Sequence, residues 1–134
     1  MKSACVAALL AAFALSAGAD PLPAEQRQGA VAFRSGGIGE DEAAAMLAAA
    51  RDYPLALEFV ARSGEDRGGW LADVDVAIRD GRGNEVLHTR ANGPVLLARL
   101  PAGRYTVTAQ NGDAQRTQRV DVPAHGTRRV VLGW

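Results

Sequence analysis

The sequence predicts a mainly β protein, an antiparallel β-sandwich that carries one amphipathic helix near its N-terminus. Beyond residue 54, apolar residues recur at every second position, which is the period of a half-buried strand. Turn signals rich in Gly, Pro and Asn separate these runs about every eight to twelve residues, as is typical of sandwiches. One stretch, 40–52, has apolar residues at helical spacing instead. The 134 residues suit a single domain.

Residues 1–19 have the pattern of a secretory signal peptide. Lys2 gives a positive start, an apolar run follows over 4–17, and Ala17-Gly18-Ala19 offers a small-residue cleavage site. The run is shorter than the roughly 20 apolar residues that a transmembrane helix needs. We therefore expect cleavage after Ala19, which takes 19 of the 134 residues and leaves a periplasmic protein of 115 with no transmembrane span. Cys5 leaves with the signal peptide, so the mature protein would have no disulfide.

The charges of the expected mature chain nearly balance. Lys2 is the one lysine, and after its removal 14 arginines face 15 acidic residues, a net charge of −1. This balance argues against nucleic acid as a partner, because phosphate binding needs a basic surplus. Residues 20–98 carry a net −5 and residues 99–134 a net +4, and we expect these charges to attract each other within the fold. An all-arginine basic set suits recognition of oxyanions, although codon usage in a GC-rich genome is the simpler explanation.

Two segments precede the sandwich. Residues 20–29 are polar and contain two prolines, so we expect a flexible tether. Residues 30–54 should form a strand-plus-helix unit, with a short strand at its start, a flexible hinge at 35–39 and a helix over 40–52 that ends before Pro54. Three acids fill the first turn of this helix, where they favour the helix dipole. Its apolar stripe consists of Ala43, Met46, Leu47, Ala50 and Tyr53.

The sandwich itself is expected to occupy 55–134. Residues 95–100 are apolar on both parities, which predicts a central strand that is covered on both faces. Asn111-Gly112 predicts a hairpin turn. The expected strands are 55–60, 73–78, 85–90, 95–100, 104–110, 115–122 and 127–134. In the last three, the residues expected to face inward are Tyr105, Val107, Ala109, Val120, Val122, Val130, Leu132 and Trp134.

Two motifs in this region resemble those of carboxypeptidase regulatory-like domains. They are Asp75-Val76-Ala77-Ile78-Arg79-Asp80 followed by Gly83-Asn84-Glu85-Val86, and Leu100-Pro101-Ala102-Gly103-Arg104-Tyr105-Thr106-Val107. The resemblance covers about residues 55–134 and implies a transthyretin-like, seven-stranded Greek-key sandwich. The family domain accompanies a zinc peptidase, and we expect no peptidase here, so the resemblance implies no catalysis and no cofactor. The stretch 33–47 is also similar to small exported proteobacterial proteins that join such a sandwich to one helix.

No catalytic motif is found, so no catalytic residue, cofactor or metal ion is expected. His88 and His125 have no second ligand at the spacing that a zinc site needs. Ser35 lacks the flanking residues of a nucleophile elbow.

Two aspartates deserve comparison with a calcium site. Asp73 and Asp75 would lie about 6.6 Å apart on one face of a strand. Together with Asp80 or Glu58 they could hold Ca²⁺, which prefers several carboxylates. A solvated outer face is the simpler interpretation, because no loop spacing here is that of a calcium motif.

The candidate ligand contacts are Trp70, Asp73, Asp75, Gly37 and Asp41. Trp70 follows two glycines at the start of a strand, where an exposed indole could stack on a sugar ring or cap the open end of the core. Gly37 lies in the hinge SGGIGE, residues 35–40, which could cradle an anion at the helix N-terminus, but the three acids at 40–42, Asp41 among them, would repel a phosphate. The loops 64–70 and 35–42 are the expected binding surfaces.

The leading functional hypothesis is a non-enzymatic periplasmic interaction module that binds an envelope protein. The first alternative is a carbohydrate-binding module of the cell envelope, which would use Trp70. The second alternative is a small enzyme of unfamiliar type, for which the available carboxylates are Asp41, Glu42, Asp73 and Asp75.

Overall fold

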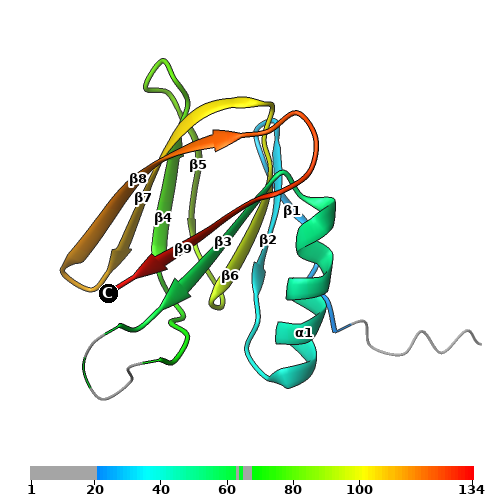
Figure 1. Cartoon of the computed structure of the whole chain (residues 1–134), viewed down its shortest axis with the longest axis vertical. Coiled ribbons are helices and arrows are strands. Elements are labelled where there is room, and N and C mark those ends of the chain that lie inside the picture. Colours follow the sequence, from blue (N-terminus) through cyan, green and yellow to red (C-terminus); the bar gives the residue numbers. More distant parts are fainter. Residues whose placement is uncertain (1–20, 63, 65–67) are drawn as a thin grey trace, which may run out of the picture.

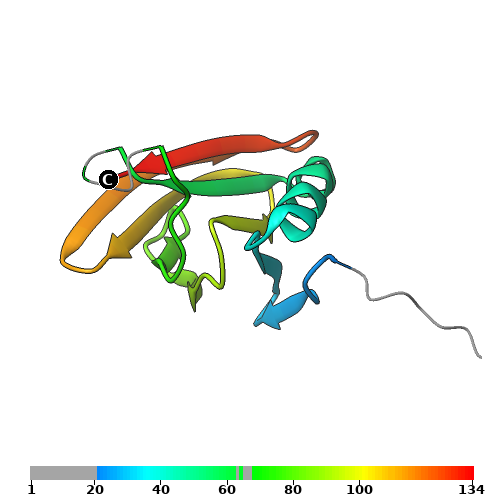
Figure 2. The same ribbon diagram turned by 90° about the horizontal axis from the view of Figure 1, so that it is seen from below.

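The computed structural model describes residues 21–62, 64 and 68–134, in which two β-sheets face each other and one α-helix lies beside them (Figures 1 and 2). The expected signal peptide and part of the loop 64–69 lie outside the described residues. The first sheet, sheet A, has the strand order β1-β2-β6-β3-β9, and the second, sheet B, has the order β5-β4-β7-β8. The elements are β1 (Gln26–Gln28), β2 (Val31–Gly36), α1 (Glu40–Ala49), the 3-10 helix η1 (Ala50–Asp52), β3 (Leu55–Val60), β4 (Asp75–Arg79), β5 (Glu85–Arg90), β6 (Val95–Arg99), β7 (Gly103–Asn111), β8 (Ala114–Val122) and β9 (Arg128–Gly133).

Strand β6 is buried on both faces, as its continuous apolar sequence predicts. It lies between β2 and β3 in sheet A. Leu96 and Ala98 face the core between the sheets, whereas Val95 and Leu97 face the helix on the other side. A strand in this position needs apolar side chains at every residue, because neither of its faces meets water.

The helix packs on the outer face of sheet A, beside β2 and β6 (Figure 1). Together α1 and η1 cover 40–52, the range that the apolar spacing predicts. Met46, Ala50 and Tyr53 from the predicted stripe are buried against Val95 and Leu97. The alanine-rich helix lacks bulky side chains at most positions and can therefore approach the sheet closely.

The core between the sheets is built from the inward residues of alternating strands. The inward set predicted for β7, β8 and β9 is buried, except that Trp134 is only partly buried. Its ring lies 6.2 Å from that of Phe59, at the open end of the sandwich. The hydroxyl of Tyr105 donates a hydrogen bond of 2.7 Å to the carbonyl of Pro101. A tyrosine that bonds back to the backbone in this way fixes the corner between two strands of a sandwich.

The topology differs from the expectation in two respects. Nine strands are found in the described residues rather than seven, because β1 and β2 join the sheet ahead of residue 55. The sandwich is not wholly antiparallel either, since β9 pairs with β3 in parallel, from Leu55 with Arg128 to Val60 with Gly133. Alternation along a strand determines which face is buried, but it carries no information about the direction of the neighbouring strand.

The expected tether at 20–29 contains β1, which pairs with β2. The side chain of Gln28 extends this pairing to the other sheet: its amide nitrogen donates to the carbonyl of His88, at 3.0 Å, and its amide oxygen accepts from the backbone N–H of His88, at 2.7 Å. One glutamine amide thus joins an edge of sheet A to an edge of sheet B.

The expected hinge at 35–39 is only partly a loop, since Ser35 and Gly36 are the last residues of β2. A Cβ atom on Gly36 would collide with the side chains of Glu42 and Pro23, and one on Gly93 would collide with the backbone of Gly36. Close approach of the backbone at Gly36 therefore explains the glycine at 93, whereas side-chain packing restricts position 36.

Within 21–62, 64 and 68–134, no helix has the length and apolar character that crossing a bilayer requires.

Candidate functional site

Trp70 lies on the same side of sheet A as the helix. The segment that follows the loop 64–69 returns antiparallel to the end of β3, with hydrogen bonds from Ala61 N–H to Gly69 O, at 2.8 Å, and from Leu71 N–H to Phe59 O, at 3.0 Å. This places Trp70 opposite Val60 as an isolated bridge. Directly opposed residues share a face of the sheet, and Val60 belongs to the outer face because Phe59 points into the core.

An apolar groove lies between Trp70 and the start of the helix. Its volume is about 510 Å³, and it is lined by Gly37, Gly39, Glu40, Ala43, Ala44, Leu47 and Trp70. Trp70 is 45% exposed, so its indole forms an open wall of the groove instead of capping the core. Ile38, from the loop that borders the groove, is 62% exposed. Exposed large apolar side chains that gather beside a concavity are typical of a binding surface.

Local hydrogen bonds fix the loop that forms one wall of this groove. The side chain of Glu42, in the first turn of α1, reaches back and accepts a hydrogen bond of 2.9 Å from the backbone N–H of Gly37. The carbonyl of Gly39 accepts from Ala43 N–H, also at 2.9 Å, and starts the helix. Gly37 and Gly39 have positive φ values of 111° and 88°, which glycine adopts without strain. These hydrogen bonds connect the loop to the first turn of the helix.

The structure brings together two of the five predicted contact residues. Trp70 and Gly37 come from the two loops expected to bind, and both line the groove. Asp41 is exposed on the first turn of α1 but does not line the groove. Asp73 and Asp75 belong with sheet B, in the opposite layer from the helix.

The prediction that Asp73 and Asp75 share a strand face is wrong. Asp73 lies before β4 and has φ of 59°, in the left-handed region, so alternation does not extend to it. Its carboxylate lies 3.9 Å from Arg90, whereas that of Asp75 lies 3.0 Å from the ring of His88. Among the described residues, no three histidine, cysteine or acidic side chains form a group that could hold a metal ion.

His88 has two acidic neighbours on the outer face of sheet B. Its Nε2 lies 3.0 Å from Asp75 and its Nδ1 lies 3.4 Å from Glu85. About half of the imidazole surface is exposed. Of the four acidic side chains considered for a small enzyme, Asp75 belongs to this group. Asp41 and Glu42 lie on the helix, and Asp73 lies beside Arg90.

Sequence reasoning missed three residues that line the groove outside the expected binding loops: Ala43, Ala44 and Leu47. The helical stripe marks Ala43 and Leu47 as apolar, and it assigns them to the core. Leu47 is only partly buried, and Ala44, one position outside the stripe, is exposed. The sequence alone does not show that these helix residues face Trp70, because that depends on a contact between segments that are distant in the sequence.

The lining of the groove is mostly apolar. Among the described residues that line it, Glu40 is ionisable, and the rest are glycine, alanine, leucine and tryptophan. What the groove offers is an apolar surface with a single aromatic ring and one carboxylate.

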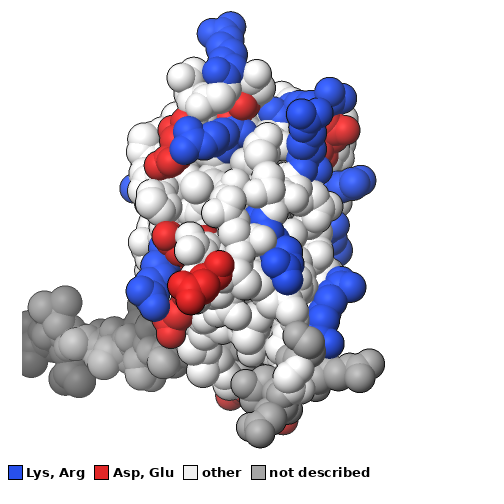
Figure 3. Space-filling model, turned by 90° about the vertical axis from the view of Figure 1, so that its left-hand side faces the viewer, with Lys and Arg blue, Asp and Glu red and all other residues white. Residues whose placement is uncertain are grey.

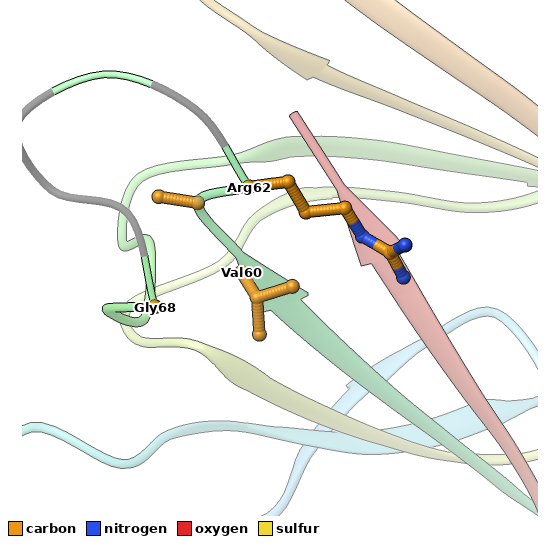
Figure 4. A pocket seen from close by; sticks show the side chains of 4 residues that line it. Val60, Arg62 and Gly68 are labelled. Carbon is orange, nitrogen blue, oxygen red and sulfur yellow. The ribbon is translucent and has the colours of Figure 1, made fainter.

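A second hollow, of about 490 Å³, lies at the end of β3 (Figure 4). Val60, Ala61, Arg62 and Gly68 line it. Arg62 extends across the end of β9, where a Cβ atom on Gly133 would collide with it (Figure 4). The backbone of Arg62 donates to the carbonyl of Trp134. The hollow adjoins Trp70 through its bridge partner Val60.

Comparisons with known proteins give structural similarity but no match in sequence. No family model matches this chain, and no curated protein matches it. A solved structure described as the Bacillus anthracis TIE protein is similar to it with a TM-score of 0.48 and 17% sequence identity. The similarity covers 59% of this chain and 16% of that one, so this chain spans about a sixth of the length of its structural neighbour.

Proposed function

We propose that this chain is a non-enzymatic binding module of the bacterial periplasm, and that the groove beside Trp70 holds an apolar side chain of an envelope protein. The observation that carries the proposal is the exposed indole of Trp70 facing an apolar helix wall. Partner anchors of this kind are usually a few large apolar side chains that fill a pocket whose shape exists beforehand. The hydrogen bond between Gly37 and Glu42 supports such a preformed shape.

We also propose that the seven strands β3 to β9 are the counterpart of the carboxypeptidase regulatory-like sandwich. These strands occupy 55–133, the region that carries the resemblance in sequence. In this interpretation β1, β2 and α1 are an N-terminal addition. The proposal gives this addition a role, because α1 supplies one wall of the groove and Trp70 of the sandwich supplies the other.

Site-directed photo-crosslinking in living cells tests the proposed interaction. A photoreactive amino acid would replace Ala44, which lines the groove and is exposed, or Thr117, which lies on exposed β8 of sheet B and serves as the control. We expect one adduct of defined mass from position 44, none from position 117, and loss of the adduct when Trp70→Ala is added. Equal adducts from both positions, or an adduct that persists without Trp70, would contradict the proposal.

The periplasmic location has its own test. Release by osmotic shock of a form that is shorter by residues 1–19 is the expected result. Retention of the full-length chain in the cytoplasm would exclude this part of the proposal.

The carbohydrate-binding alternative is supported by the same exposed indole, since a half-exposed tryptophan can stack on a sugar ring. Titration with peptidoglycan fragments, followed by tryptophan fluorescence, distinguishes it. If sugars bind, the emission change persists in Trp134→Phe and disappears in Trp70→Phe. The absence of any change in the wild-type protein would remove this alternative and leave the protein partner.

A further inference from the structure

The outer face of sheet B carries exposed arginines, several of which lie beside acidic residues. Register pairs Arg79 of β4 with Thr106 of β7, and Thr106 with Arg119 of β8, so these three residues form one row across the sheet. Arg104 lies two residues before Thr106 on the same strand and therefore on the same face. Three arginines thus surround one threonine. Figure 3 shows basic side chains gathered toward the upper part of the molecule on this side, with acidic ones among them.

These side chains enclose a hollow of about 400 Å³. Its lining consists of Arg79, Asp80, Gly81, Gly83, Arg104, Thr106 and Arg119. The lining holds three guanidinium groups and one carboxylate, and the carboxylates of Glu85 and Asp121 contact two of these guanidinium groups. The carboxylate of Asp80 is engaged by its own turn, because its Oδ1 accepts hydrogen bonds from the backbone N–H groups of Arg82 and Asn84, at 2.9 and 3.0 Å.

The three guanidinium groups keep donors free for a ligand. Arg79 contacts Glu85, at 3.4 Å, and donates to the carbonyl of Gly83, at 3.3 Å, while Arg104 contacts Asp121, at 3.2 Å. Arg119 has no ion pair within the described part of the chain. A guanidinium has five N–H donors, so one or two contacts leave others unused. Both ion pairs are exposed, and exposed pairs are weak enough for a more highly charged anion to compete with them.

We propose that this hollow binds a phosphomonoester group. A planar guanidinium matches two oxygens of a phosphate at once, and a phosphomonoester presents three terminal oxygens and close to two negative charges. Thr106, which is half-buried and pairs in register with Arg79 and Arg119, adds a neutral hydroxyl to the lining. The ligand could be a small phosphorylated molecule or the headgroup of a lipid, since both carry the same group. The site is separate from the Trp70 groove, which lies on the opposite layer.

Titration followed by NMR tests the proposal on the purified protein. Phenyl phosphate, a phosphomonoester, should shift the backbone resonances of Thr106 and Arg119 saturably, while diphenyl phosphate, a diester, should do so much less. Arg119→Gln should weaken the binding about tenfold, as expected for the loss of a charge-assisted contact. Arg128→Gln removes the same charge from β9 of sheet A and should leave the affinity unchanged. Equal weakening by the two variants, or no saturable shift at millimolar concentrations, would overturn the proposal.

Vesicles distinguish the two sources of the group. Phosphatidic acid carries a phosphomonoester headgroup, whereas phosphatidylcholine does not. Binding to vesicles that contain phosphatidic acid, with loss in Arg119→Gln, identifies a lipid headgroup. Binding of phenyl phosphate without vesicle binding identifies a small soluble ligand. Vesicle binding that Arg119→Gln does not affect would contradict the assignment of the hollow.

Discussion

The role of Trp70 depends on a contact that the residues next to it in the sequence do not reveal. From the sequence, an indole after two glycines can equally cap the core or face solvent. The bridge between Trp70 and Val60 decides between these, because it places the indole on the outer face of sheet A. Gly37 could be named as a contact from its loop alone, but its position opposite Trp70 could not. The candidate site was therefore predictable as two loops, and its third component, the helix wall, was not.

At the same scale, the hydrogen bond of Tyr105 gives a direct prediction. Tyr105→Phe removes the hydroxyl that donates to the carbonyl of Pro101 and leaves the ring in the core. We expect the free energy of unfolding to fall by about 1 kcal/mol, the usual net value of such a bond. Urea denaturation measures it. An unchanged midpoint would show that water replaces the hydroxyl at this corner without loss.

The cluster around Glu25 predicts a pH dependence. Donation by the Tyr53 hydroxyl, together with Arg99 and Arg34, holds the pKa of the Glu25 carboxyl below its ordinary value of 4.5. A carboxyl whose pKa is lower in the folded state stabilises the fold above its unfolded pKa, and this contribution is lost as the pH falls through the folded one. Glu25→Gln should therefore be less stable than wild type at pH 7, with the difference shrinking below pH 4.5. Urea denaturation at a series of pH values measures it, and a difference that stays constant across this range would contradict the assignment.

At the scale of elements, the sequence predicts which face of a strand is buried better than it predicts which strand lies beside it. Strand β6 was predictable as a central strand because an apolar residue at every position has no other use in a sandwich. Strand β1 was not predictable, because all three of its residues, Gln26–Gln28, are polar and exposed. It pairs with β2 through the backbone, and the amide of Gln28 bonds to His88. The parallel pairing of β9 with β3 was equally hidden, since no local pattern specifies it.

Close packing of the 91–94 loop against the end of β2 predicts the effect of a glycine substitution. In Gly93→Ala the new methyl group would overlap the backbone of Gly36, so the loop or the strand end must move. We expect a loss of about 2 kcal/mol or more in the free energy of unfolding. Gly81→Ala is the matched control, because its Cβ would lie 3.6 Å from the nearest atom, the carbonyl oxygen of Arg104. Equal effects of the two substitutions, measured by urea denaturation, would refute the close approach.

At the scale of the whole molecule, sheet A joins two apolar layers. Its inner face contributes Leu57 to the core between the sheets, and its outer face contributes Leu97 to the packing under the helix. Both layers share the same strands, so the helix and the sandwich should unfold together. The opposite charges of the two parts of the sequence also meet within the fold, for example where Glu25 contacts Arg99 at 3.3 Å.

Met46→Ala tests this coupling. Met46 is fully buried between the helix and β6, and its truncation should lower the free energy of unfolding by about 2–5 kcal/mol. Fluorescence of Trp70, recorded in a Trp134→Phe background, reports on the helix side. Fluorescence of Trp134, recorded with Trp70→Phe, reports on the core side. The two transitions should coincide in urea, and an earlier transition at Trp70 would show that the helix layer unfolds by itself.

The two tryptophans also provide the most direct measurement of the binding groove. The indole N–H of Trp134 donates to the carbonyl of Ala114, at 2.9 Å. The C-terminus lies on the opposite side of the molecule from α1 (Figure 1). NMR spectra of the protein alone and with the partner captured by crosslinking at position 44 would follow both indole signals in one sample. We predict that the partner shifts the Trp70 signal and leaves the Trp134 signal in place. A shift confined to Trp134, or no shift of Trp70 at a saturating concentration of the partner, would contradict the groove as the binding site.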